Sequence, residues 1–272
     1  MTKLVADCCA NHMGDRRIME AMIKAAADAG VDIVKFQSWK ADKLRKDWPD
    51  YDNAYKYYKQ HELSEDDHRW LVGKCKEYGV EFLTTVFDLE TVNFLRRLGL
   101  KKVKIASPDA NNWALIDKCL KKFDEVILST GMHSPVEIQE INSYMSAESS
   151  RQQKTSFLHC ISTYPTKPEE VNMRIMTYNQ NPFTTVGFSD HTIGVDAGKL
   201  AIALGAEYLE KHFTLSRYLP GKDQAISGTP EEFAELVRWR DLVSIMKGES
   251  WRELSEAELA NRRLYVGRWS GA

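Results

Sequence analysis

Eight short apolar runs, rich in β-branched residues, alternate with amphipathic helical stretches through most of this 272-residue chain. Runs of this kind are typical of strands that are buried on both faces, as they are in parallel sheets. We predict strands over residues 4–8, 32–36, 81–85, 102–106, 125–129, 156–160, 185–188 and 208–211. We predict helices over residues 16–29, 66–78, 89–98, 113–121, 135–145, 168–178, 195–204 and 230–246.

Eight strand–helix units favour a closed (β/α)8 barrel, the TIM-barrel fold, which commonly occupies about 250 residues as one domain. The alternative is an open doubly wound sheet, which would usually carry a glycine-rich phosphate loop after its first strand. That loop reads CCANHMGD here. We therefore expect one barrel domain over residues 1–250 and a helical tail over 251–272. The long insertion at 39–61 follows the second strand, so we expect it on the catalytic rim.

Composition excludes several classes of partner. A net charge of −2 gives no reason to expect nucleic acid or an anionic membrane surface. No run of about 18 apolar residues occurs, and Asp7 and His12 interrupt the N-terminal stretch where a signal peptide would be apolar. Five cysteines without a CxxC pair indicate a reducing compartment rather than a disulfide framework. We expect a cytoplasmic protein.

Polar residues collect at the predicted C-terminal ends of the strands, where TIM barrels carry their active sites. Lys35 and Lys104 would both point into the barrel mouth. Burying two ammonium groups is costly unless an anion pairs with them. Hydroxyl groups of Thr85, Ser107 and Ser129 would complete an anion-binding cup. This arrangement predicts a small, multiply charged ligand that carries a phosphate and a carboxylate.

His191 and His212 end the seventh and eighth strands, which are neighbours in a closed barrel. Glu210, Asp190 and Asp223 are close to them in the sequence. Imidazole nitrogens mixed with carboxylate oxygens suit Mn²⁺, Fe²⁺, Co²⁺, Zn²⁺ or Mg²⁺. The alternative is a pair of structural histidines that are hydrogen-bonded inside the barrel.

Nine segments in order between residues 6 and 227 resemble the N-acetylneuraminate (sialic acid) synthase family, which includes legionaminic and pseudaminic acid synthases. They are ADCCANHMGD, VDIVKFQ, EFLTTVFD, VKIAS, LSTGM, LHCISTYPT, VGFSDHTIG, LGAEYLEKHFTL and PGKDQAIS. The SDHT and EKHF pair is the most specific part. The resemblance implies a transferase that joins phosphoenolpyruvate to an open-chain sugar aldehyde, such as N-acetylmannosamine or a related hexose. Water is consumed, and the products are a nonulosonic acid and phosphate.

The resemblance also implies roles for individual residues. His191 and His212 would hold a divalent metal ion, with Mn²⁺ expected first and Mg²⁺ or Co²⁺ as alternatives. The implied catalytic residues are Asp7, Lys104 and Glu210. The implied substrate-binding residues are Lys35, Gln37, Thr85, Ser107, Ser129, Ser162, Tyr164, Ser189 and Asp223. The implied partners are phosphoenolpyruvate, the sugar aldehyde and a second copy in a homodimer.

The sequence departs from the family pattern in three places. Asp7 stands where relatives usually have Glu, and Ser162 stands where bacterial members often have Asn. Cys8 and Cys9 are unusual in the first strand, and Cys9 is either a third metal ligand or a buried inert thiol. We expect no antifreeze-like domain after the barrel.

Three other functions compete with this interpretation. One is another phosphoenolpyruvate-dependent 3-deoxy-ulosonate synthase that acts on a shorter or phosphorylated sugar. A second is an inactive sugar-binding subunit of a glycan pathway. A third is a zinc hydrolase, although such barrels usually begin with an HxH pair on the first strand, which is missing here.

Overall fold

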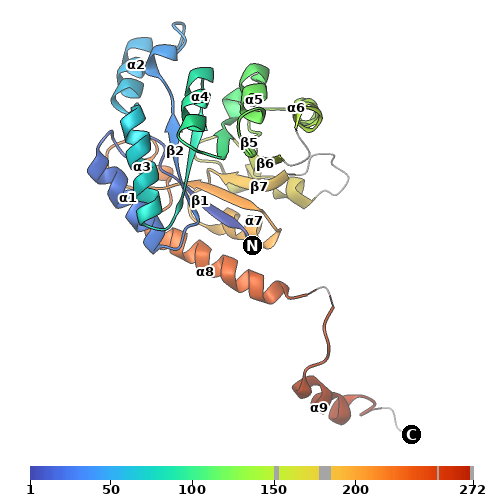
Figure 1. Ribbon diagram of the computed structural model, residues 1–272. Coiled ribbons are helices and arrows are strands. Elements are labelled where there is room, and N and C mark those ends of the chain that lie inside the picture. Colours follow the sequence, from blue (N-terminus) through green and yellow to red (C-terminus); the bar gives the residue numbers. More distant parts are fainter. Residues whose placement is uncertain (150–152, 178–184, 250, 270–272) are drawn as a thin grey trace.

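The computed structural model describes residues 1–149, 153–177, 185–249 and 251–269. Eight parallel strands form a closed barrel in the order of the sequence, which confirms the predicted TIM-barrel fold (Figure 1). The strands are β1 (Lys3–Asp7), β2 (Ile33–Ser38), β3 (Glu81–Val86), β4 (Lys102–Ile105), β5 (Glu125–Ser129), β6 (Lys154–Cys160), β7 (Thr185–Asp190) and β8 (Tyr208–His212). Every predicted strand boundary lies within two residues of the observed one.

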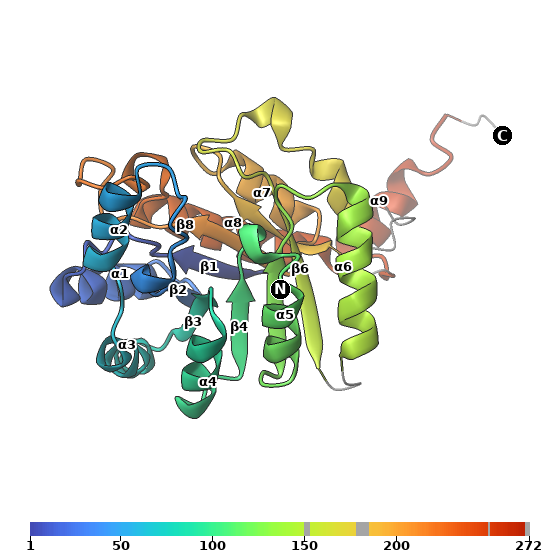
Figure 2. The same ribbon diagram turned by 90° about the horizontal axis from the view of Figure 1, so that it is seen from above.

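A layer of helices surrounds the strands (Figure 2). These are α1 (Arg16–Asp28), α3 (Glu65–Glu77), α4 (Leu89–Arg97), α5 (Trp113–Leu120), α6 (Pro135–Glu148), α7 (Asp196–Ala203) and α8 (Pro230–Lys247). Ser64, Ser134 and Thr229 each close a capping box at the start of α3, α6 and α8. These side chains satisfy backbone N–H groups that the first helical turn leaves unpaired, and for this reason the helix starts are readable in the sequence. Within the described residues, no helix is both long and apolar enough to cross a membrane.

The helix predicted over 168–178 is wrong in its described part. Two short 3₁₀ segments, Pro168–Glu170 and Met173–Thr177, take its place, and residue 178 lies outside the described residues. Asn172 between them has a φ of 50°, which no α-helix accommodates. His159 Nε2 contacts the backbone oxygen of Val171 at 2.7 Å, so a barrel side chain satisfies a carbonyl that a helix would have used.

The insertion at 39–61 contains a 3₁₀ turn at Ala41–Lys43 and the helix α2 (Tyr51–Gln60). It lies between β2 and α3, beside the C-terminal ends of the strands, as predicted (Figure 1). Trp39 anchors it, because its indole nitrogen donates to the backbone oxygen of Tyr58 over 2.9 Å. The buried Trp39 ring also packs edge-on against Phe87 after β3.

Two layers of side chains fill the interior of the barrel. The lower layer is apolar and consists of Val5, Ile33, Leu83, Ile127, Leu158 and Tyr208. Strand side chains that are two residues apart share a face. The next inward positions along the same strands are therefore Asp7, Lys35, Thr85, Ser129, Cys160 and Glu210. The apolar layer closes the floor, and the polar layer above it belongs to the cavity at the barrel mouth.

Gly187 makes room for Tyr208, the one aromatic residue of this apolar layer. A Cβ atom at this position would lie 2.5 Å from Leu158 Cδ2 and 2.6 Å from the backbone oxygen of Tyr208. Neither atom has space to retreat in a close-packed interior. The glycine lets β7 pass close to β8 and places Ser189, two residues later, at the mouth.

The helix α9 (Glu256–Tyr265) follows α8 and lies apart from the barrel in Figure 1. Its residues are exposed or half-buried. Within the predicted helical tail over 251–272, the structure describes one helix, α9, and the last three residues lie outside the described part of the chain.

Candidate active site

A cavity of about 680 Å³ opens at the C-terminal ends of the strands. Every residue to which the resemblance assigns a catalytic, substrate-binding or metal-binding role lines this cavity except Asp223. These residues are Asp7, Lys35, Gln37, Thr85, Lys104, Ser107, Ser129, Ser162, Tyr164, Ser189, His191, Glu210 and His212. They come from all eight strands or the loops directly after them. The barrel closure therefore brings together side chains that are up to about 200 positions apart in the sequence.

Two buried lysines and two buried carboxylates form the charged centre of the cavity. Lys35 Nζ lies 2.8 Å from Asp7 Oδ2 and 3.5 Å from Glu210 Oε1. Lys104 Nζ lies 3.2 Å from the same oxygen of Glu210. The sequence argument that an outside anion must offset the lysines is corrected here, because Asp7 and Glu210 already balance their charge. A bound anion would therefore contact a cluster of two lysines and two carboxylates whose charges already cancel.

The network shifts its pKa values in opposite directions. Burial lowers the pKa of Lys35, but the carboxylates of Asp7 and Glu210 outweigh burial and raise it overall. Burial also lowers the pKa of Lys104, and together with the charge of Lys35 it outweighs the opposing effect of Glu210, so this pKa is lowered overall. Burial raises the pKa of Glu210, but the charges of the two lysines outweigh burial, so the pKa of Glu210 is lowered overall. Lys104 is consequently the more easily deprotonated of the two ammonium groups.

Three predicted hydroxyl side chains bind directly to this centre. Lys35 Nζ donates to Thr85 Oγ1 over 3.1 Å, Lys104 Nζ donates to Ser129 Oγ over 2.6 Å, and Ser189 Oγ donates to Glu210 Oε1 over 3.2 Å. Glu210 Oε2 is buried without a hydrogen-bond partner among the described residues. An unsatisfied buried carboxylate oxygen costs free energy, so this atom marks a place for a donor from a ligand or from water.

Two further hydroxyl groups lie around Gly131, in the loop after β5. Ser107 Oγ accepts a hydrogen bond from the Gly131 nitrogen over 3.0 Å. A Cβ atom at Gly131 would lie only 2.2 Å from Ser162 Oγ and 3.2 Å from Cys160 Sγ. The absence of a side chain at Gly131, after β5, thus lets Ser107 from the loop after β4 and Cys160 and Ser162 from the end of β6 converge on one point.

His191 and His212 lie next to each other, as predicted. Their rings are stacked, with centroids 5.4 Å apart and an interplanar angle of 19°. Tyr164 covers His191 at a centroid distance of 4.2 Å. Asp7 Oδ2 lies 3.5 Å from His212 Nδ1. The pair therefore lies at the edge of the charged centre, beside the carboxylate of β1.

The donor atoms around this pair fit a divalent cation. His191 Nδ1 contacts the backbone oxygen of Ile161 at 2.7 Å, which leaves Nε2 with a lone pair for a metal. His212 Nδ1 is buried and has no hydrogen-bond partner in the described chain. Among the described residues no group of three or more His, Cys, Asp or Glu side chains is arranged to hold a metal. A cation here would complete its coordination with water or substrate oxygens, as catalytic metal sites do.

Cys8 and Cys9 do not line the cavity. Both thiols are buried, and burial, followed by nearby acidic charge, raises their pKa values well above the ordinary value. The Cys9 backbone nitrogen instead donates to Asp7 Oδ1 over 2.9 Å, which fixes the orientation of that carboxylate.

The residues predicted to bind the sugar occupy different depths. Gln37 Nε2 donates to Asp7 Oδ2 over 3.2 Å, while Tyr164 is 55% exposed at the mouth. Asp223 lies in the loop after β8 and is not part of the cavity lining. Its charge nevertheless reaches α2, because burial and then Asp223 raise the pKa of Tyr58.

Sequence reasoning missed several residues of the lining. Cys160 lies 3.8 Å from His191 Nδ1, and strand alternation from the buried Leu158 would have placed it inward. Trp39 and Trp48 of the insertion also line the cavity, and no periodic signal in that segment marks them.

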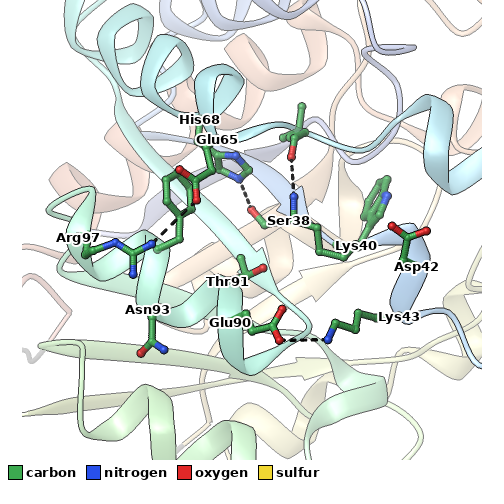
Figure 3. A pocket seen from close by; sticks show the side chains of 13 residues that line it. Ser38, Lys40, Asp42, Lys43, Glu65, His68, Glu90, Thr91, Asn93 and Arg97 are labelled. Carbon is green, nitrogen blue, oxygen red and sulfur yellow. Dashed lines mark hydrogen bonds and ion pairs between the residues drawn. The ribbon is translucent and has the colours of Figure 1, made fainter.

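A second cavity of about 500 Å³ lies beside the first, between the insertion and helices α3 and α4 (Figure 3). Its cations already have partners: Lys43 lies 3.3 Å from Glu90, and Arg97 lies 4.0 Å from Glu65. These pairs are largely exposed, so they contribute little energy. This cavity lacks the buried, converging charges of the barrel mouth, and we assign the active site to the latter.

Fold and site together define a (β/α)8-barrel enzyme with a charged, hydroxyl-rich centre at the strand ends. A sequence profile of the NeuB family matches residues 22–251. N,N'-diacetyllegionaminic acid synthase of Legionella pneumophila is 35% identical over 96% of this chain and 77% of the relative. N-acetylneuraminate-9-phosphate synthase of Homo sapiens is 32% identical over 94% and 74%, respectively.

Structural comparison agrees with the sequence comparison. The N-acetylneuraminic acid (sialic acid) synthetase of Leptospira borgpetersenii superposes with a TM-score of 0.87 at 29% identity. The match covers 97% of this chain and 92% of that one. The chain belongs to the NeuB family of sialic acid synthase-like enzymes, and it is a transferase-type enzyme of carbohydrate biosynthesis.

Proposed function

We propose that this enzyme condenses phosphoenolpyruvate with the aldehyde of an open-chain hexose or N-acylhexosamine. The products would be a nonulosonic acid and phosphate. The observation that carries the proposal is the paired charged centre, Asp7–Lys35–Glu210–Lys104, at the mouth of a NeuB-family barrel. Hydroxyl groups border this centre, as recognition of a phosphate and a carboxylate requires.

Lys35 and Lys104 would bind the anionic groups of phosphoenolpyruvate, together with Thr85, Ser107, Ser129, Ser162 and Ser189. An ammonium group has three N–H donors, and the contacts of Lys104 with Glu210 and Ser129 leave one of them for a further acceptor, whereas Lys35 already faces Asp7, Glu210 and Thr85. These donors are fixed before the substrate arrives, so they require little reorganisation as charge moves from the enol phosphate to the leaving phosphate.

His191 and His212 would hold a divalent cation, for which Mn²⁺ is our first candidate and Mg²⁺ or Co²⁺ are alternatives. When bound, the cation would supply Lewis-acid polarisation of the aldehyde oxygen. Tyr164 packs over His191, so it shields the pair from bulk water and restricts the ring orientation. We place this chemistry in the reducing cytoplasm, in keeping with five buried, unpaired cysteines.

The reaction balances with one water molecule. C3 of phosphoenolpyruvate forms a bond to the aldehyde carbon, and the aldehyde oxygen takes up a proton. Water adds at C2, and the bond from C2 to the phosphate oxygen breaks to release inorganic phosphate. Asp7 and Glu210 are the carboxylates that would transfer these protons, and Lys104 would stabilise the anionic intermediate. Gln37, Tyr164 and Asp223 would contact the sugar.

The test is phosphate release from phosphoenolpyruvate against a panel of aldoses and N-acylhexosamines, with and without Mn²⁺. We expect release that depends on both the acceptor and the metal, and activity that EDTA removes. Lys104→Met should reduce kcat/KM for phosphoenolpyruvate by about 30-fold or more, because removing one partner of a buried charge pair typically costs about 2–5 kcal/mol. Glu90→Gln, which alters the exposed pair in the second cavity, is the matched control and should leave turnover unchanged.

The same panel separates the acceptors. A labelled product formed only with a phosphorylated or shorter aldose would indicate a different 3-deoxy-ulosonate synthase. Phosphate release that is absent with every acceptor and metal would refute the proposed reaction. Full activity after EDTA treatment would refute the metal.

A further inference from the structure

A second buried ion pair lies behind the two histidines, on the outer face of the barrel. Lys211 Nζ is 3.0 Å from Asp190 Oδ2, and the two side chains are 1% and 0% exposed. Asp190 and Lys211 face each other as register partners of β7 and β8. Each directly precedes a histidine, and neither lines the cavity. Because side chains alternate along a strand, the ion pair faces the helix layer, while His191 and His212 face the mouth.

This pair fixes the backbone on both sides of His191. Asp190 Oδ1 accepts hydrogen bonds from the Thr192 nitrogen and from Thr192 Oγ1, each over 2.8 Å. Lys211 Nζ also donates to the backbone oxygen of Thr192. The His191 backbone oxygen in turn accepts from the Thr166 nitrogen over 3.0 Å. The turn that carries the His191 ring is therefore held by its own strand, by β8 and by the loop after β6.

Stability alone does not explain two charges in this place. Moving an ion pair out of water carries a desolvation cost of several kcal/mol per ion, and apolar side chains of similar size are often equally stable or more stable there. The residues two positions away from the pair on the same face of β7 and β8, Phe188, Leu209 and Phe213, are buried and apolar. An ion pair differs from an apolar contact in direction and distance, since it holds two strand ends at one separation. Those two strand ends carry the stacked imidazoles, 5.4 Å apart.

We propose that Asp190 and Lys211 are positioning residues that set the spacing and orientation of the His191 and His212 rings, and thereby the cation affinity of the site. This inference rests on the proposed cation site. Two ligands on separate strands bind one ion well only if their separation is already correct, because the binding energy otherwise moves the strands.

The test uses the apolar double variant Asp190→Leu/Lys211→Met, which keeps the packing volume and removes both charges. We expect its free energy of unfolding to equal or exceed that of the wild type, and its Mn²⁺ affinity to fall by at least tenfold. The affinity is measured by electron paramagnetic resonance titration of free Mn²⁺, without substrates. In turnover, the Mn²⁺ concentration for half-maximal rate should rise, while KM for phosphoenolpyruvate stays unchanged. Wild-type Mn²⁺ affinity in the double variant would overturn the inference.

Two controls keep the outcomes separate. Arg240→Leu breaks a partly buried pair with Asp32 at the opposite end of the barrel, and it should lower stability without altering Mn²⁺ affinity. The double variant His191→Ala/His212→Ala should lose Mn²⁺ binding. If it binds Mn²⁺ like the wild type, the proposed cation site itself fails, which is a different result from failure of the positioning role.

Thr192→Val decides the matter if the apolar double variant does not fold. It removes only the hydroxyl bond to Asp190 and keeps the ion pair. We expect two- to fivefold weaker Mn²⁺ binding from this loosened turn. Unchanged affinity in the folded variant would overturn the inference.

Discussion

Glu210→Gln tests the central feature of the site, the sharing of one carboxylate by two buried lysines. Glu210 Oε1 lies 3.2 Å from Lys104 and 3.5 Å from Lys35. The substitution keeps the shape of the side chain and removes its charge. Lys35 retains Asp7 as a partner at 2.8 Å, whereas Lys104 is left, among the described residues, with neutral acceptors, the hydroxyl of Ser129 and the amide oxygen that the substitution introduces. The cost therefore falls mainly on Lys104.

The magnitude follows from the burial of that group. Both side chains are at least 93% buried, so solvent screens their interaction weakly. Leaving one partner of a buried pair alone typically costs about 3–5 kcal/mol. Burial already lowers the pKa of Lys104, and loss of Glu210 removes the strongest opposing influence. Lys104 can then limit the damage by releasing its proton, and we expect a loss of about 3 kcal/mol of unfolding free energy near pH 7.

The measurement is urea unfolding of four proteins: wild type, Glu210→Gln, Lys104→Met and the double variant. Removing both partners should cost less than the two single changes together, with a coupling energy of about 2 kcal/mol or more. Glu90→Gln is the control, because its partner Lys43 is exposed and the pair should contribute less than about 1 kcal/mol. Single-variant losses under about 1 kcal/mol, or strictly additive losses, would show that the centre is not an ion-paired unit.

Three other predictions concern the same end of the barrel. Asp7→Asn should nearly abolish product formation while Asp7→Glu leaves measurable activity, and wild-type turnover by Asp7→Asn would exclude a proton-transfer role. Burial lowers the pKa of His12 to about 4, so as the pH falls the unfolded chain binds a proton at His12 before the folded protein does. The free energy of unfolding should therefore fall by roughly 3 kcal/mol as the pH drops from about 6.5 to about 4. His12→Gln should flatten this pH dependence in urea unfolding, and an unchanged slope would contradict the prediction. Gly131→Ala should displace Ser162 and raise KM for phosphoenolpyruvate at least tenfold. The control is Gly73→Ala on α3, where a methyl group meets no neighbouring atom and KM should stay unchanged. Equal KM values in the two variants would refute the steric argument.

Much of this fold follows from one property of the sequence: apolar runs, which become strands buried on both faces, alternate with amphipathic stretches, which become helices. Strand alternation also predicts which side chains face inward. Counting two residues from Val5, Ile33 and Leu83 leads to Asp7, Lys35 and Thr85. The site residues at the strand ends are therefore predictable, because the barrel geometry leaves them no other direction.

Long-range partnerships were not predictable in the same way. The pairing of Lys35 with both Asp7 and Glu210 depends on the closure of β8 against β1, which no local pattern encodes. The segment at 168–178 failed for a related reason. Its composition suits a helix, but His159 from the barrel takes the carbonyl of Val171, and this tertiary contact overrides the local preference.

The contacts of Asp7 explain the effect of having Asp here in place of the longer Glu. Its Oδ1 accepts from the Cys9 nitrogen over 2.9 Å, and its Oδ2 lies 2.8 Å from Lys35, 3.2 Å from Gln37 and 3.5 Å from His212. An additional methylene would carry the carboxylate away from the Cys9 nitrogen and toward the cavity. Asp at this position therefore reaches less far into the cavity than Glu would, but its carboxylate is held in one orientation between Lys35 and His212. Such a carboxylate serves proton transfer only if the substrate comes to it, which requires the acceptor aldehyde to bind deep in the mouth, below Tyr164.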